Sequence, residues 1–233
     1  MVLKIINDEN IYKLNFKELK FDGIICLKGD LPSSDVFRQF GKLPLFAADG
    51  AANKLSEIGL IPDYIIGDLD SIEIKSIEHF GGKSKIIQLP DQDSSDFEKI
   101  LNFIIKEHLR NMLILGFHGG DLEHTLNNWS ILKKFAGRLN LCIYDKGRYG
   151  LPILHSIKFF PNPGELLSLI PQPKARLTTK NFKWELNDEI LELGTREGAR
   201  NQASHNEVSI ILHDGELILF MDSRIPFAPE LTF

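Results

Sequence analysis

A repeated alternation of short apolar runs with helix-like segments, over residues 20–146, constrains the fold of this 233-residue chain more than any other feature. The apolar runs have the length of buried strands and lie at residues 24–27, 45–48, 64–66, 85–89, 112–115 and 139–144. Between them lie helix-like segments at about residues 33–40, 49–59, 71–80, 94–108 and 122–135. Strands that are joined by helices pair in parallel. We therefore expect a doubly wound, mostly parallel α/β sheet.

The pattern changes after residue 146. Glycine and proline interrupt short apolar runs at residues 156–160, 166–170, 190–193, 208–212 and 217–221, and no segment has a long helical period. This predicts a smaller antiparallel β-sandwich or barrel. We expect an α/β domain over residues 1–147 and a β domain over residues 148–233, packed closely because no linker separates them. Residues 2–6 also read as a short strand.

Composition excludes several classes of function. The net charge of -5 argues against a nucleic-acid or membrane-surface partner, which would need a basic excess. Cys26 and Cys142 lie inside apolar runs, so we expect buried, reduced thiols. No apolar stretch has spanning length and the amino end is unlike a signal peptide, so the expected location is cytoplasmic.

Two carboxylates follow the strand predicted at residues 64–66. Asp68 and Asp70 come just after Gly67, and two residues apart on an extended backbone they would point the same way. Open α/β sheets bind ligands at this carboxyl edge. Carboxylates can hold Mg²⁺ there against a phosphate chain. The alternative is that Asp70 and Ser71 cap the next helix and Asp68 is a loop acid.

Further acids follow the neighbouring strands. They are Asp49, then Asp91, Asp93 and Asp96, then Asp121 and Glu123 beside His124 after the Gly119-Gly120 turn. Acids along one edge repel one another unless a cation or a shared proton compensates, so the set favours a metal site. Asp93 is placed to cap the helix at 94–108. Lys99 lies three residues after Asp96 on one helix face and could reach a phosphate, although an ordinary surface ion pair is the alternative.

These motifs occur in a fixed order. They are Ala48-Asp49-Gly50-Ala51-Ala52-Asn53, Pro62 to Ser71, Asp91 to Asp96 with Lys99, Gly119-Gly120 with His124-Thr125-Leu126 and Asn128, and then Phe182-Lys183-Trp184, Leu186, Gly194-Thr195 and Asn201. In order and spacing the sequence resembles the thiamine pyrophosphokinase (thiamine diphosphokinase) family from about residue 22 onward.

The resemblance implies transfer of the pyrophosphoryl group of ATP to the hydroxyl of thiamine, giving thiamine diphosphate and AMP. It implies Mg²⁺ as cofactor, ATP as co-substrate, and a homodimer with shared active sites. Such transfer needs mainly positioning and charge neutralisation. The implied catalytic residues are Asp68, Asp70, Asp93, Asp96 and Lys99, and the four aspartates are also the implied metal ligands. The implied substrate-binding residues are Asp49, Asn53, Ser71, Gln92, Gly120, His124, Asn128, Trp184, Arg200 and Asn201.

Trp184 and two departures from the family pattern leave alternatives open. Trp184 could stack on a cationic ring or could be a core aromatic. The family has arginine at the position of Asp121 and serine at that of Arg200. Arg200 could supply the missing cation, either by pairing with Asp121 across the domain or dimer interface or by reaching the phosphates directly. The alternatives are a pyrophosphokinase for another hydroxyalkyl heterocycle, a non-catalytic nucleotide-binding homologue, or a metal-dependent hydrolase. Retention of all the acids speaks against a non-catalytic protein.

Overall fold

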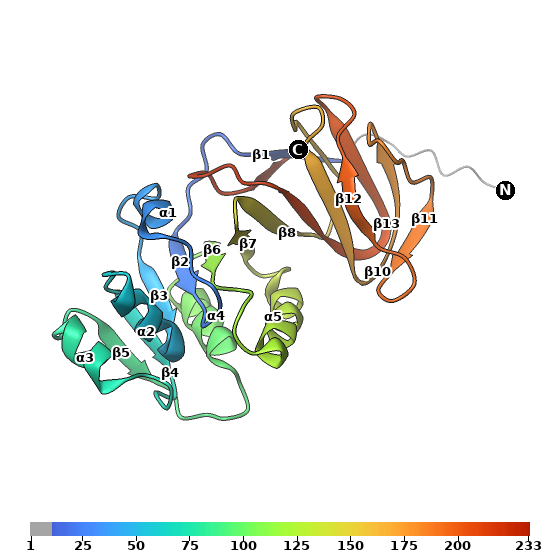
Figure 1. The fold of residues 1–233 in the computed structure, drawn as a ribbon. Coiled ribbons are helices and arrows are strands. Elements are labelled where there is room, and N and C mark those ends of the chain that lie inside the picture. The colour runs from blue at the N-terminus through green and yellow to red at the C-terminus, as the bar shows by residue number, and fades with distance from the viewer. Residues whose placement is uncertain (1–10) are drawn as a thin grey trace. The chain divides into compact units, whose positions relative to one another are not determined.

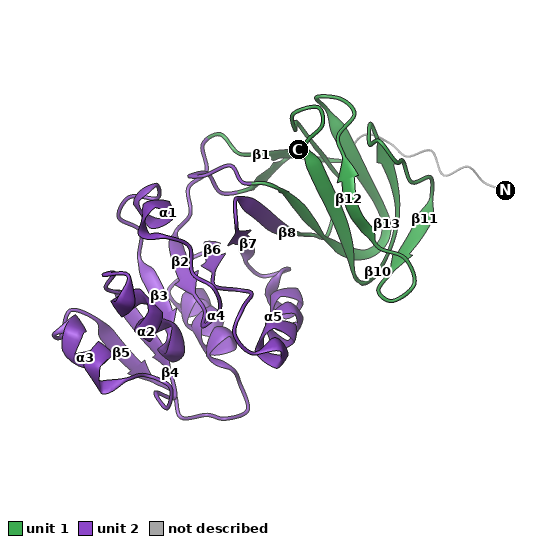
Figure 2. Cartoon of the chain, in the orientation of Figure 1, with its two compact units in different colours: residues 1–17, 151–222, 229–233 green, residues 18–150, 223–228 purple. Residues whose placement is uncertain are grey.

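The computed structural model describes residues 11–233, and these divide into two compact units (Figures 1 and 2). The α/β unit comprises residues 18–150 and 223–228, shown in purple in Figure 2. The β unit comprises residues 11–17, 151–222 and 229–233, shown in green. The expected functional division at residue 147 stays a prediction, and the strand expected at residues 2–6 lies outside the described residues.

The α/β unit is built on a mostly parallel sheet. Its strands are β2 (Gly23–Cys26), β3 (Leu45–Ala48), β4 (Tyr64–Gly67), β5 (Lys85–Gln88), β6 (Asn111–Leu115), β7 (Asn140–Asp145) and the first three residues of β8 (Arg148–Ile153), in the order β8-β7-β6-β2-β3-β4-β5. All neighbouring pairs are parallel except β7 with β8. The strand order changes direction at β2, because β3 lies on one side of it and β6 on the other. Doubly wound sheets bind ligands at such a point, beyond the carboxyl ends of the strands.

Five helices connect these strands, namely α1 (Ser34–Arg38), α2 (Asp49–Glu57), α3 (Ile74–Phe80), α4 (Asp96–Lys106) and α5 (Leu122–Phe135). Helix α4 buries Phe97, Ile100, Leu101 and Ile104, which recur at helical spacing on one face. Strands β2 and β3 are buried along their whole length, which explains why they read as continuous apolar runs. The predicted doubly wound class is confirmed.

Two helix starts differ from the prediction. Ser95, and not Asp93, caps α4, because its hydroxyl accepts a hydrogen bond from the Glu98 backbone N–H at 3.4 Å. The backbone N–H of Asp93 is instead drawn toward the Asp91 carboxylate, at 3.1 Å. Helix α3 begins at Ile74, so Asp70 and Ser71 do not cap it and the capping alternative was wrong.

The β unit is built around two long antiparallel strands, β10 (Leu166–Lys180) and β13 (Val208–Asp222). Strands β11 (Glu189–Glu192) and β12 (Gly198–Gln202) pair with β10, and β9 (Ile157–Phe159) pairs with β13. Strand β1 (Tyr12–Asn15) lies between β9 and β14 (Glu230–Thr232). The predicted antiparallel β class is confirmed.

The strand lengths in this unit were predicted wrongly. The runs at 208–212 and 217–221 are one strand, and the run at 166–170 continues to residue 180. The pairing of β10 with β13 shifts register between Pro171 and Ala175, where Gly215 has a φ of 76°. Proline and glycine mark a bulge inside paired strands there, whereas the sequence pattern had suggested a turn.

Cys26 and Cys142 are buried and unpaired by disulfide, as predicted. Burial raises the pKa of both thiols, so they stay protonated and unreactive. Among residues 11–233, no helix combines the length and the apolar character that crossing a bilayer requires.

Candidate active site

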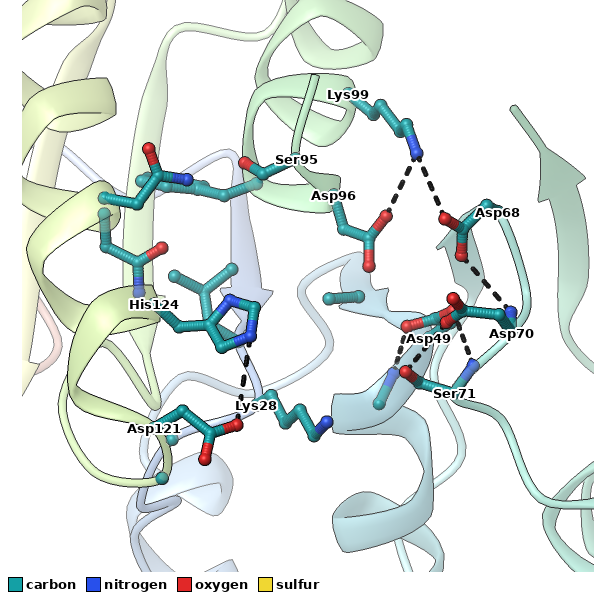
Figure 3. A pocket seen from close by; sticks show the side chains of 18 of the residues that line it. Lys28, Asp49, Asp68, Asp70, Ser71, Ser95, Asp96, Lys99, Asp121 and His124 are labelled. Atoms are coloured by element: carbon teal, nitrogen blue, oxygen red, sulfur yellow. Dashed lines mark hydrogen bonds and ion pairs between the residues drawn. The ribbon is translucent and has the colours of Figure 1, made fainter. Parts of the chain in front are cut away.

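A cleft of about 750 Å³ lies at the carboxyl end of the parallel sheet, entirely within the α/β unit (Figure 3). Its walls come from the segments that follow β2, β3, β4, β5 and β6 and from the amino ends of α2, α4 and α5. The predicted site residues that line it are Asp49, Asp68, Asp70, Ser71, Gln92, Asp93, Asp96, Lys99, Gly120, His124 and Asn128. The sheet therefore brings together motifs that are up to 80 residues apart, as expected for strands that end at one edge.

Three carboxylates form the centre of this cleft. Asp49, Asp68 and Asp70 each contribute one oxygen, and these oxygens all lie within 4.8 Å of one another. Asp49 is the first residue of α2, and Leu69 has a φ of 72°, so the chain turns sharply between the other two. The turn is held by hydrogen bonds from the Asp70 N–H to Asp68 Oδ1 (3.2 Å) and from the Ser71 N–H to Asp49 Oδ2 (3.3 Å).

The donor chemistry of this group fits Mg²⁺. It offers hard carboxylate oxygens from three residues, within reach of one cation and open to a cleft that can admit water and phosphate oxygens. Gly67 makes the close approach feasible, because a Cβ there would lie 3.0 Å from Asp96 Oδ1 and 3.1 Å from Asp49 Cγ. The group contains two of the predicted ligands and adds Asp49. The other two predicted ligands, Asp93 and Asp96, line the cleft but are not members of the group.

Asp96 and Lys99 lie beside the carboxylate group on the first turn of α4. The Lys99 ammonium is 3.4 Å from Asp96 Oδ1 and 4.0 Å from Asp68 Oδ2, and Lys99 is only 5% exposed. The alternative interpretation of Lys99 as a surface ion pair was therefore wrong. Burial and the neighbouring Asp49 carboxylate raise the pKa of Asp96 to about 7, although Lys99 opposes the shift. The carboxylates beside Lys99 therefore carry more negative charge than its single ammonium compensates.

Asp68 is affected in the opposite direction. The backbone N–H of Asp70 lowers the pKa of Asp68, and the Gln92 amide and the Lys99 charge act in the same sense. Gln92 Nε2 donates to Asp68 Oδ2 at 2.9 Å. Asp68 is therefore held as a carboxylate that is oriented from several sides, which suits a metal ligand.

Asn53 and Asn128 support the cleft through backbone contacts. Asn53 Nδ2 donates to the Ser71 carbonyl (2.8 Å) and Asn53 Oδ1 accepts from the Glu73 N–H (2.9 Å), so this residue fixes the segment after Asp70. Asn128 Nδ2 donates to the Phe117 carbonyl at 3.1 Å and holds the loop after β6. The same loop continues to Gly120, which has a positive φ of 71° and lines the cleft.

His124 faces Asp121 across the first turn of α5. His124 Nε2 lies 3.8 Å from Asp121 Oδ2, and both side chains are largely exposed. In the view of Figure 3 this pair lies opposite the group of Asp49, Asp68 and Asp70. Asp121 thus has a basic neighbour within its own helix turn.

The remaining predicted residues belong to the β unit. Trp184 is 56% exposed, so the core-aromatic alternative was wrong. Asn201 is buried and holds Trp184 by its backbone, since Nδ2 donates to the Trp184 carbonyl (2.7 Å) and Oδ1 accepts from the Trp184 N–H (3.2 Å). Arg200 has a φ of 59°, and its N–H donates to Ser168 Oγ at 2.9 Å. The predicted link between Arg200 and Asp121 joins residues of different units and stays a prediction.

Two lysines that line the cleft were not predicted from the sequence. Lys28 lies two residues after the end of β2 and lines the cleft, and Lys54 on α2 also lines it. The available signal was position alone, because Lys28 follows its strand just as the acids follow theirs. Its proximity to the acids depends on the strand order, which places β2 between β3 and β6.

Comparison with known proteins gives consistent results along most of the chain. A family described as "Thiamin pyrophosphokinase, catalytic domain" matches residues 43–143, and one described as "Thiamin pyrophosphokinase, vitamin B1 binding domain" matches residues 154–216. The chain is similar to "Thiamine pyrophosphokinase 1" of Oryza sativa subsp. japonica, at 30% identity over 70% of this chain and 67% of that protein. It is also similar to "Thiamine pyrophosphokinase" of Bacillus subtilis (strain 168), at 27% identity over 71% of this chain and 80% of that protein.

Solved structures share the fold. Yeast thiamin pyrophosphokinase superposes with a TM-score of 0.76 at 20% identity, covering 95% of this chain and 93% of that chain. The thiamine pyrophosphokinase from Bacillus subtilis gives a TM-score of 0.72 at 20% identity, covering 87% of this chain and all of that chain. Two family matches that together span both halves of the sequence, and a relative at 30% identity, agree with the acidic cleft, and the chain belongs to the thiamine pyrophosphokinase family.

Proposed function

We propose that the chain transfers the pyrophosphoryl group of ATP to the hydroxyl of thiamine, giving thiamine diphosphate and AMP, and that the cleft of the α/β unit holds the nucleotide. One observation supports placing the reaction in the cleft. Carboxylate oxygens of Asp49, Asp68 and Asp70 lie within 4.8 Å of one another, beside the ion pair of Lys99 with Asp96. Phosphoryl-type transfer is catalysed mainly by positioning and by neutralising charge. The cleft supplies groups for both.

The residues of the cleft have distinct proposed roles. Asp49, Asp68 and Asp70 would hold Mg²⁺, which when bound neutralises phosphate charge. Lys99 orients Asp68 and Asp96 through its two ion pairs. Gln92 holds Asp68 in place through the hydrogen bond to Oδ2. These contacts fix the carboxylates before any ligand arrives, which reduces the cost of ordering them on binding.

The β unit is the proposed source of the thiamine contacts. Trp184 presents an exposed ring on a backbone that Asn201 holds at two points. An exposed indole can stack on the flat cationic ring of thiamine, a contact of about 0.5–2 kcal/mol. A homodimer with shared active sites is a further proposal from the sequence resemblance, and light scattering coupled to size exclusion measures it. A cytoplasmic location is proposed from the sequence pattern alone.

An acceptor panel tests the proposed reaction. AMP release from ATP is followed with Mg²⁺ and with thiamine or a related hydroxyalkyl heterocycle as acceptor, for the wild-type protein, Asp70→Asn and the control Asp35→Asn. Asp35 lies on α1 in an exposed ion pair with Arg38 and away from the cleft. We expect thiamine-dependent AMP release that Asp70→Asn abolishes and Asp35→Asn preserves.

Three other outcomes would change the assignment. AMP release with a different heterocycle but not with thiamine would support the alternative acceptor class. Release of inorganic phosphate or pyrophosphate without any acceptor would support the hydrolase instead, and no turnover at all would contradict catalysis by this chain.

A further inference from the structure

We propose that Lys28 binds the polyphosphate of the nucleotide, as the cation that the cleft keeps free for an anionic ligand. The proposal deepens the function proposed above and rests on it. Three observations support it: the loop after β2 is held in place, the Lys28 methylene groups lie against α2, and the other two lysines of the cleft have partners.

The backbone around Lys28 is tied to the loop after β6. The N–H of Leu27 donates to the Leu115 carbonyl and that of Gly29 to the Gly116 carbonyl, both at 2.9 Å, and that of Asp30 donates to the His118 carbonyl at 2.6 Å. The contact is too close for a side chain at residue 29, where a Cβ would lie 2.0 Å from the His118 carbonyl oxygen. Lys28 therefore projects from a fixed base.

A second contact, from helix α2, fixes the same loop. Lys54 on α2 donates from Nζ to the Gly29 carbonyl at 2.7 Å. Lys54 is thus already used in holding the loop, because one of the three N–H donors of its ammonium is bound to the Gly29 carbonyl. Its role is to position the segment that carries Lys28.

The stem of Lys28 lies across the first turn of α2. A Cβ built on Gly50 would lie 2.8 Å from Lys28 Cδ and 3.2 Å from Cγ. The lack of a side chain at Gly50 therefore leaves the space that the Lys28 methylene groups occupy. The amino end of a helix carries partial positive charge and disfavours a neighbouring cation. The Lys28 ammonium therefore does not stabilise α2 by its charge. An anion in the cleft would be attracted both by this ammonium and by the partial positive charge at the amino end of α2.

The charges of the cleft wall distinguish Lys28 from the other lysines. Six aspartates and three lysines line the cleft. Lys99 is paired with Asp96 and Asp68, and Lys54 with the Gly29 carbonyl. Across residues 11–233, Lys28 has neither an ion pair nor a hydrogen bond from its side chain, and it is exposed to the cleft. Figure 3 shows its side chain in the region between the Asp121–His124 pair and Asp49.

This arrangement matches a polyphosphate better than another ligand. Mg²⁺ on the carboxylate group would neutralise part of the phosphate charge, and the aspartates would repel the remaining phosphate oxygens. A lysine ammonium is a compact point charge that binds phosphate without demanding one orientation. Lys28 therefore determines affinity for the phosphate chain and not for the nucleoside.

Binding measurements on matched lysine variants test the proposal. Dissociation constants for MgATP, for magnesium tripolyphosphate and for adenosine are measured by calorimetry with wild type, Lys28→Met, Lys28→Arg and the control Lys42→Met. Lys42 is exposed and lies outside the cleft wall. We expect Lys28→Met to weaken MgATP and tripolyphosphate by about 10- to 100-fold, the range for losing one charge-assisted hydrogen bond. Adenosine binding should not change.

Steady-state kinetics supply a readout that a merely structural role would not produce. Lys28→Met should raise KM for ATP and leave KM for thiamine unchanged, Lys28→Arg should restore most of the affinity, and Lys42→Met should match wild type. Unchanged MgATP binding in Lys28→Met, or equal weakening of adenosine, would overturn the role of Lys28 while the proposed function stands. Failure of the wild-type protein to bind MgATP would overturn the proposed function and this inference together.

Discussion

Replacing Gly67 with alanine should impair catalysis far more than it impairs folding. Gly67 ends β4, and a Cβ there would lie 3.0 Å from Asp96 Oδ1 and 3.1 Å from the Cγ atoms of Asp96 and Asp49. Ordinary van der Waals contact begins at 3.4 Å, so both carboxylates must move by a few tenths of an ångström. The φ of Gly67 is not in the left-handed region, so alanine adds no backbone strain.

The expected magnitudes follow from this displacement. Overpacking a buried site costs about 1–3 kcal/mol, and the low end applies because only two side chains must move. A loss of about 1 kcal/mol lowers Tm by about 2–4 °C in a chain of this size. Misplacing a catalytic group by about 1 Å costs about 100-fold in rate, so a smaller shift of two acids should cost about 10- to 100-fold in AMP formation.

The assay compares Gly67→Ala with Gly41→Ala in thermal unfolding and in thiamine-dependent AMP formation. Gly41 has a φ of 67° and open space around it, so alanine there is strained by about 1 kcal/mol without touching the cleft. We expect both variants to lose similar stability and only Gly67→Ala to lose activity. Wild-type activity and Mg²⁺ dependence in Gly67→Ala would refute the inferred crowding of Asp49 and Asp96.

Three further predictions concern the charges and the exposed ring. Asp70→Asn should abolish AMP formation without lowering Tm, because removing one of several crowded acids relieves repulsion; a Tm loss of several degrees would contradict this. The raised pKa of Asp96, about 7 against an ordinary 3.8, means that the folded protein binds more protons than the unfolded chain between about pH 4 and pH 7. Without Mg²⁺, therefore, the free energy of unfolding should fall as pH rises through that window. Added Mg²⁺ or Asp96→Asn should flatten the dependence of Tm on pH in a melting series, and an equally steep dependence in Asp96→Asn would assign the effect elsewhere. Trp184→Ala should raise KM for thiamine and leave KM for ATP unchanged, and a change in both constants would exclude a separate stacking role.

The α/β unit could be predicted from the sequence because most of its strands are buried on both faces, the exposed edge strand β5 being the exception. β2 and β3 are apolar without interruption, and the helices between them have their own period, so the two patterns cannot be confused. The long strands β10 and β13 were harder to predict. Their bulge at Pro171, Ala175 and Gly215 has the same residue types as a turn, and only the pairing of the two strands distinguishes them.

The candidate site was predictable to the extent that it depends on strand ends. Asp68 and Asp70 lie together as their spacing predicted, but a turn at Leu69 (φ 72°) brings them together, and the expected extended backbone was wrong. Asp49 joins them because β3 pairs with β4 in a register that aligns Ala48 with Ile66, and spacing does not encode that register. The presence of Lys28 in the cleft depends in addition on the place of β2 in the strand order, between β6 and β3.

The position of the metal ion in the protein with a non-hydrolysable ATP analogue tests the proposed site most directly. Mn²⁺ in place of Mg²⁺ gives an anomalous scattering peak that locates the ion independently of the surrounding atoms. We expect one peak coordinated by Asp49, Asp68 and Asp70, with the phosphate chain extending from it toward Lys28. A metal held by Asp93 without Asp49, or a nucleotide bound outside the cleft of the α/β unit, would contradict it.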